Sequence, residues 1–108
     1  NEKVAYLYDP AHPAVLRMIK NIIEAAHSAG IKVGMCGEMA GEPAFALILL
    51  GLGLDGFSMP PFVIPELKYT IRSVTLKDAK EVAHQVLKLS TGKEVEEFCR
   101  LRLREILR

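Results

Sequence analysis

The chain has 108 residues, a formal net charge of +1 and a hydrophobic content of 50%. This length permits one domain at most, and so small a charge argues against a nucleic-acid or anionic-membrane partner. No apolar run reaches the roughly 18–20 residues of a membrane span, and the start is polar rather than a signal peptide. The two cysteines lack metal-ligand or disulfide spacing. We therefore expect a reducing, cytoplasmic setting.

The first third of the chain predicts a loop, a helix and a strand. Residues 1–10 form the loop, with an apolar cluster at residues 6–8. His12 and Pro13 begin the helix, and Gly30 ends it. A short strand follows over residues 31–35. The apolar stripe of the helix comprises Val15, Leu16, Ile19, Ile22, Ile23 and Ala26.

The middle of the chain predicts a second helix between two parallel strands. Residues 37–41 read as a loop, and a helix begins at Pro43 and ends at Gly51 and Gly53. Residues 44–50 contain no polar side chain, so this helix is buried on every side or pressed against another subunit. A second strand over residues 54–59 then ends at two prolines. Because no hairpin signal separates the strands, we expect an α/β unit.

Three more helices follow, each with a signal at its N-terminus. Pro65 begins the first, Thr75 with Asp78 begins the second, and Thr91 with Glu94 begins the third. The last two pairs have the spacing of a capping box. The apolar stripes are Leu67, Ile71 and Val74; Ala79, Val82, Ala83 and Val86; and Val95, Phe98, Cys99, Leu103 and Ile106.

Cys36 is the residue with the clearest potential for chemistry. It ends the first predicted strand between Gly34 and Gly37, where the backbone can bend and a ligand can come close. Chemistry in parallel α/β proteins is found at such strand ends. The alternative for a lone cysteine is burial as a small core residue. Ser58 and Met59 end the second strand and should line the same opening.

The other candidate residues have simpler roles. His12 is placed to cap a helix, His27 lies in a last helical turn where a cation is favoured, and His84 reads as a surface residue. Cys99 lies on an apolar stripe and reads as structural. Glu38 could hold the loop or a backbone amide near Cys36, or it could be a solvated loop carboxylate.

Three blocks resemble enzyme I of the bacterial sugar phosphotransferase system, the phosphoenolpyruvate (PEP)-protein phosphotransferase family. Residues 34–41, GMCGEMAG, resemble its active-site cysteine motif. Residues 4–10, VAYLYDP, and residues 49–59, LLGLGLDGFSM, resemble the flanking segments. The similarity covers the whole chain and is weakest after Thr75.

The chain departs from the family pattern at two places. Glu42 stands where the family usually has aspartate, which keeps a carboxylate at a helix start. Pro60 and Pro61 stand where small polar residues are expected, which changes the rim of the opening.

The resemblance implies an α/β fold that is incomplete by itself. Residues 1–108 would form one partial domain: the C-terminal part, about the last two βα units, of a PEP-binding (β/α)₈ TIM barrel, plus extra C-terminal helices. A closed barrel needs eight strands, and two strands leave both sheet edges open. We therefore expect the isolated chain to pair with itself, swap segments or stay partly loose.

The resemblance also implies a reaction. The family transfers phosphoryl from PEP to an enzyme histidine and on to a phosphocarrier protein, and Cys36 would donate the proton to pyruvate enolate. Gly37 would offer its backbone N–H near the enolate, and Glu38 would support the loop. The Mg²⁺ ligands, the substrate-clamping arginines and the phosphorylated histidine would lie outside this chain, so we expect the isolated chain to be inactive.

Two alternatives remain open. The chain could belong to PEP synthase or pyruvate phosphate dikinase, which have a similar barrel and cysteine. It could instead be a non-catalytic dimerisation module, since its apolar helices suit a homodimer or swapped interface. Cys36 distinguishes the enzymatic role from the dimerisation role.

Overall fold

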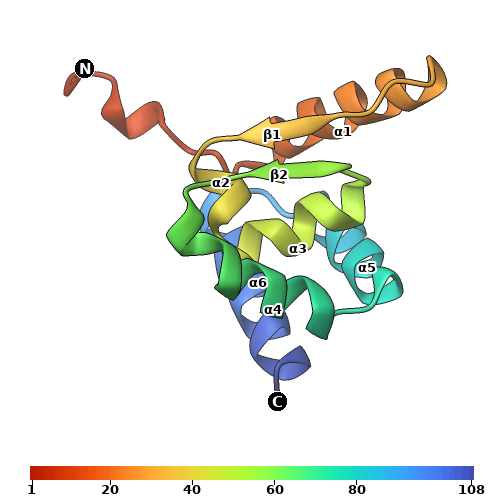
Figure 1. Cartoon of the computed structure of the whole chain (residues 1–108). Helices are drawn as coiled ribbons and strands as arrows, with labels where there is room; N and C mark the ends of the chain where they lie inside the picture. Colours follow the sequence, from red (N-terminus) through yellow and green to blue (C-terminus); the bar gives the residue numbers. More distant parts are fainter.

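A small parallel sheet lies against a central helix in the computed structural model, which describes residues 1–108 (Figure 1). β1 (Gly34–Cys36) pairs with β2 (Gly56–Ser58), and α3 (Pro43–Leu52) connects them. The Cα partners are Gly34 with Gly56, Met35 with Phe57, and Cys36 with Ser58. The remaining elements are the 3₁₀ helix η1 (Ala5–Leu7), α1 (Pro13–Ser28), α2 (Glu38–Gly41), the 3₁₀ helix η2 (Pro61–Val63), α4 (Ile64–Ser73), α5 (Leu76–Val86) and α6 (Gly92–Ile106).

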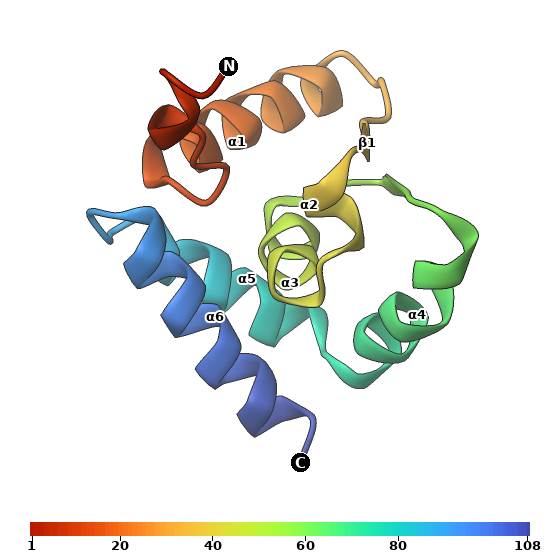
Figure 2. The same cartoon turned by 90° about the vertical axis from the view of Figure 1, so that its left-hand side faces the viewer.

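The helices cover only one side of the sheet. Figure 2 looks toward the carboxyl ends of both strands and shows α1, α3 and α4 around one side of them, with α5 and α6 beyond α3. The N-terminal segment with η1 extends away from the rest of the chain (Figure 1). The α/β expectation thus holds in a coarse form, as a mostly helical chain with a two-stranded parallel sheet. None of the helices combines the length and apolar character needed to cross a membrane.

The predicted burial of α3 is confirmed. Its residues Ala44, Ala46, Leu47, Ile48 and Leu49 are all buried. The helix packs against α5 and α6 on one side and lies against the sheet on the other. Most of its apolar surface is therefore covered by this chain itself.

Gly51 does not end α3, contrary to the sequence prediction. The helix continues to Leu52 and ends at Gly53, which has a left-handed φ of 97°. Gly51 instead lies at the crossing of α3 and α5, where an added Cβ would overlap the carbonyl oxygen of Ala79. Glycine is needed at position 51 because the two helices approach closely.

The predicted N-terminal caps are present, but the Thr75–Asp78 pair forms only half of the expected capping box. The Nδ1 atom of His12 accepts a hydrogen bond from the Ala14 N–H at 3.0 Å and caps α1. Thr75 caps α5 through the Asp78 N–H, and Thr91 with Glu94 forms a complete capping box on α6. These side chains satisfy N–H groups that a helix cannot pair internally.

Gly30 ends α1 as predicted, in a Schellman arrangement. Its φ is +74°, its N–H donates to the His27 carbonyl at 3.0 Å, and the Ile31 N–H donates to the Ala26 carbonyl at 2.8 Å. The last turn of α1 is therefore held firmly, and His27 lies in it.

Three further local predictions are wrong. β1 begins at Gly34 rather than residue 31, and Ile31 is 60% exposed, because only three residue pairs of the two strands overlap. β2 is likewise restricted to Gly56–Ser58. The predicted loop at residues 37–41 contains the short helix α2.

The apolar stripe of α1 is only partly buried. Leu16 and Ile23 are fully buried, but Val15 and Ile22 are exposed because no other element of this chain covers that side of the helix. The apolar cluster at residues 6–8 is also exposed and lies at η1 rather than in a plain loop.

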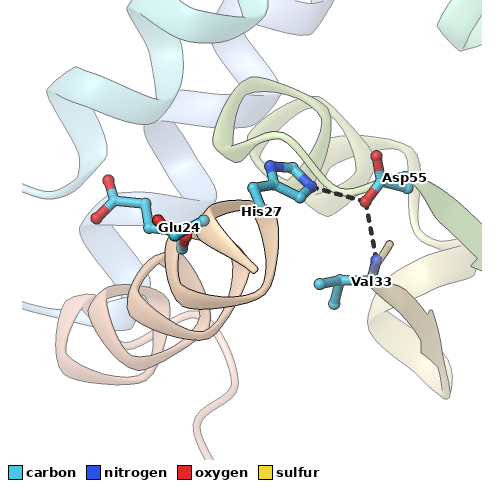
Figure 3. A network of polar contacts seen from close by, with 5 residues as sticks. Glu24, His27, Val33 and Asp55 are labelled. Atoms are coloured by element: carbon cyan, nitrogen blue, oxygen red, sulfur yellow. Dashed lines mark hydrogen bonds and ion pairs between the residues drawn. The ribbon is translucent and has the colours of Figure 1, made fainter. Parts of the chain in front are cut away.

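Asp55 forms two side-chain contacts at the start of the sheet (Figure 3). Its Oδ2 atom accepts hydrogen bonds from the Val33 N–H at 2.8 Å and from His27 Nε2 at 2.7 Å. The hydrogen bond from Val33, and then that from His27, lower the pKa of the Asp55 carboxyl below its usual value. Ionised Asp55 therefore stabilises the folded chain, even though its side chain is about one-third exposed (32%).

We predict that Gly51→Ala lowers the free energy of unfolding by about 1–3 kcal/mol, because α5 must move away from α3. The higher helix propensity of alanine acts in the opposite direction but is worth only about 1 kcal/mol. Urea unfolding measures the change. Gly34→Ala is the control, since its Cβ meets nothing closer than the Gly56 carbonyl oxygen at 3.6 Å. Equal stability of Gly51→Ala and the parent would contradict the close helix approach.

We predict that Asp55→Asn lowers the urea midpoint at pH 7 and that the deficit shrinks as the pH falls from about 5 to about 3. A carboxyl whose folded pKa is lowered stabilises the fold above its unfolded pKa, and this is lost as the pH falls through the folded pKa. Glu24→Gln is the control, because Glu24 forms only an exposed pair with Lys20 at 3.7 Å. A deficit that is independent of pH would be evidence against an ionised Asp55 contact.

Candidate functional site

A cavity of about 530 Å³ lies at the carboxyl edge of the sheet. Cys36, at the end of β1, and Ser58, at the end of β2, form one part of its wall. Gly37 and Glu38 contribute from the β1–α2 junction, and Met59 and Val63 contribute from the segment after β2. The expectation that Ser58 and Met59 share an opening with Cys36 is confirmed, because parallel strands end at the same edge.

Cys36 faces the open side of the sheet. Met35 and Phe57, its neighbours in the ladder, pack against a buried cluster that includes Ile23 and Leu49. Since side chains alternate along a strand, Cys36 and Ser58 lie on the opposite face. Cys36 is exposed, so the alternative of burial in the core is wrong for this thiol.

Cys99 is the contrasting thiol. It is fully buried in the main core cluster, as expected for a structural residue. Desolvation by burial raises its pKa to about 12. Cys99 therefore stays a neutral thiol, and Cys36 is the only cysteine that solvent or a ligand can reach.

Gly37 makes the turn from β1 into α2. Its φ of 123° and ψ of 179° fall in a region that essentially only glycine adopts. An added Cβ would meet nothing within 4 Å, so the backbone conformation and not the available space requires glycine. This turn brings α2 directly beside the thiol.

The cavity wall is acidic on the α2 side. Glu38 and Glu42 both line the cavity and also line a neighbouring hollow of about 290 Å³ with Asp9 and Glu96. Glu42 precedes α3, but its side chain makes no capping hydrogen bond. The Glu38 side chain is exposed and makes no hydrogen bond to the loop.

The histidines lie outside the cavity. His12 caps α1 and His84 is exposed on α5, both as predicted. His27 contacts Asp55, a partner that the sequence analysis missed, because no sequence spacing links residues 28 positions apart. No group of three or more His, Cys, Asp or Glu side chains is placed to hold a metal ion.

Gly41 and Val63 also line the cavity, and the sequence analysis did not select them. Pro60 lines it too, as expected of a residue at the rim of the opening. Gly41 contributes because it faces η2, with the Val63 Cγ1 at 3.1 Å from the position of an added Cβ. The prolines at positions 60 and 61 were the available signal, since they force the chain to turn after β2 and begin η2.

Comparison with known proteins gives consistent results. The family model described as "PEP-utilising enzyme, PEP-binding domain" matches residues 1–76. Curated proteins named phosphoenolpyruvate-protein phosphotransferase are 45% identical in Haemophilus influenzae and 48% identical in Bacillus subtilis, each over 98 residues and 91% of this chain. One from Staphylococcus carnosus is 45% identical over 95 residues, or 88% of this chain. The chain spans only 17% of the length of each of these relatives. The chain belongs to the PEP-binding domain family of PEP-utilising enzymes.

Proposed function

We propose that the chain is the part of a PEP-protein phosphotransferase that delivers a proton to pyruvate enolate. The observation that carries this proposal is the exposed Cys36 thiol in a cavity at the carboxyl edge of a parallel sheet. The named relatives support the choice of this enzyme over PEP synthase or pyruvate phosphate dikinase. The function deduced from the cysteine motif is therefore the best supported one.

The proposed reaction has two steps. The phosphoryl group of PEP passes to a histidine outside this chain, the phosphate ester bond breaks, and its electron pair leaves pyruvate as the enolate. The enolate methylene carbon then takes the proton of the Cys36 thiol, which gives pyruvate and a thiolate. Solvent reprotonates the thiolate. A neutral thiol carries one proton, which it can give to a carbon base as a general acid.

The neighbours of Cys36 have supporting roles in this proposal. Gly37 lines the cavity, and its backbone N–H is assigned to the enolate oxygen, where a preorganised donor stabilises negative charge. Glu38 lines the same cavity and is assigned a supporting role beside the thiol, although its side chain makes no hydrogen bond to the loop within this chain. Magnesium, if the whole enzyme uses it, would be bound outside this chain and would neutralise charge on the phosphoryl group.

The proposed setting of the chain is an incomplete barrel. Residues 1–108 would form one partial domain, the last two βα units of a (β/α)₈ barrel with extra C-terminal helices. The two strands have only each other as partners, their Cys36 face is uncovered, and the Val15 side of α1 is exposed. An upstream part of the same protein would cover these surfaces.

The partners follow from the proposed enzyme. PEP and pyruvate would be its substrate and product, and a phosphocarrier protein would be reached through a separate N-terminal domain in the cytoplasm. The isolated chain would be inactive, because the phosphorylated histidine and metal ligands are elsewhere. Exposed apolar residues such as Phe62 and Leu101 also favour contacts with a second subunit, and a non-catalytic dimerisation module remains the alternative function.

We predict that Cys36→Ala lowers PEP-dependent pyruvate formation by at least about 100-fold, the usual range for loss of a general acid. The assay uses a chimera in which this chain replaces the matching segment of the Bacillus subtilis relative. Cys99→Ala is the matched control and should keep near-parental activity, because Cys99 is buried in the core. Size-exclusion chromatography checks that the assembly state is unchanged. Near-parental turnover by Cys36→Ala would favour the dimerisation role.

A further inference from the structure

The geometry points to Asp55 as a positioning residue that fixes the register of β1 on β2 and so holds Cys36 beside Ser58 at the cavity. The register is a property of the chain itself. Only its consequence for catalysis rests on the proposed function.

Asp55 is bonded to the strand start through both its side chain and its backbone. Its Oδ2 atom accepts from the Val33 N–H at 2.8 Å, and its own N–H donates to the Val33 carbonyl at 2.9 Å. The Gly56 N–H donates to the same carbonyl at 3.2 Å. Both the N–H and the carbonyl of Val33 are therefore hydrogen-bonded at the start of β2, to Asp55 and Gly56.

His27 holds the Asp55 carboxylate in place. Its Nε2 atom lies 2.7 Å from Oδ2, and Figure 3 shows the ring pointing from the end of α1 toward Asp55. Because an ionised carboxylate only accepts hydrogen bonds, Nε2 is the donor. The last turn of α1 is fixed at Gly30, so this contact attaches the start of the sheet to a rigid helix end.

The sheet itself provides little to fix the register. It has three residue pairs, and each strand has one unpaired edge. A slip of one residue would turn Cys36 toward α3, and a slip of two would move it away from Ser58. The pair of Gly34 and Gly56 has no side chains, and the pair of Cys36 and Ser58 lies on the uncovered face. Side-chain packing therefore stabilises the register mainly through Met35 and Phe57. The Asp55 contacts lie immediately before the first pair, where they decide which residues face each other.

A disulfide measures this register directly. In Ser58→Cys, the introduced thiol lies opposite Cys36 on the same face. Neighbouring strands are about 4.7–4.9 Å apart, which is inside the Cα separation of about 4.4–6.8 Å that a disulfide accepts. Cys99 does not compete, because it is buried. The equilibrium fraction of intramolecular disulfide in a glutathione buffer, measured by mass spectrometry after alkylation, gives the effective concentration of the two thiols.

We expect Ser58→Cys to form the disulfide readily in the 108-residue chain, and adding Asp55→Ala to lower the effective concentration by about tenfold or more, as expected when hydrogen bonds to a charged group are lost. Asp55→Asn should have a smaller effect, because the amide oxygen can still accept from Val33. His27→Gln should also lower it. Adding Glu24→Gln, on the same helix but outside the contact, should change nothing.

A second thiol position reports on slippage. In Gly56→Cys the introduced thiol faces Gly34 in the observed register, where an added Cβ meets nothing closer than 3.9 Å. It should pair poorly with Cys36 in the parent background and better after Asp55→Ala. Circular dichroism checks that each variant folds. If Asp55→Ala unfolds, the two single variants Asp55→Asn and His27→Gln decide the question. Unchanged disulfide formation in all folded Asp55 and His27 variants would overturn the inference.

The catalytic consequence is measured separately in the chimera described above. Asp55→Asn should lower kcat for pyruvate formation and leave KM for PEP unchanged, because the proposed phosphate-binding groups lie elsewhere. A loss of disulfide formation together with an unchanged kcat would keep the register role and would instead contradict the proton-donor role of Cys36.

Discussion

The register of two three-residue strands is the constraint on which the site depends. Cys36 is useful only if its side chain leaves the sheet on the uncovered face and at the carboxyl edge. Parallel pairing places both strand ends at that edge, and the contact between Val33 and Asp55 selects the pairing. The buried helix α3 then supports the opposite face through Met35 and Phe57.

The two faces of the sheet differ, because one packs on a dense helical core and the other is open. The core formed by α3, α5 and α6 is closely packed, and the approach at Gly51 leaves no room for a methyl group. Above it, the sheet face with Cys36 has no cover in this chain, and both strands have an unpaired edge. The proposed barrel explains this asymmetry. The sheet face on the α3 side is covered within this chain, and the Cys36 face would be covered by the parts of the barrel that bind phosphate and metal.

Much of this arrangement could be predicted where local chemistry decides it. Capping by Thr91, the glycine stop at Gly30 and the burial of α3 follow from neighbouring residues alone, and the placement of Cys36 follows from a strand ending in glycine. Contacts between distant segments could not be predicted. The Asp55–His27 pair exists only once α1 and β2 are adjacent, the role of Gly51 depends on where α5 crosses, and the strand lengths depend on how far two segments overlap.

Exchange of the methyl hydrogens of pyruvate with D₂O tests the central claim most directly, because it isolates the proton step from phosphoryl transfer. The thiolate of Cys36 would remove a methyl proton, exchange it with solvent and return deuterium. In the chimera we predict deuterium incorporation for the parent and for Cys99→Ala, and none above the uncatalysed rate for Cys36→Ala. Incorporation at the parental rate by Cys36→Ala would contradict the assignment of this thiol as the proton donor.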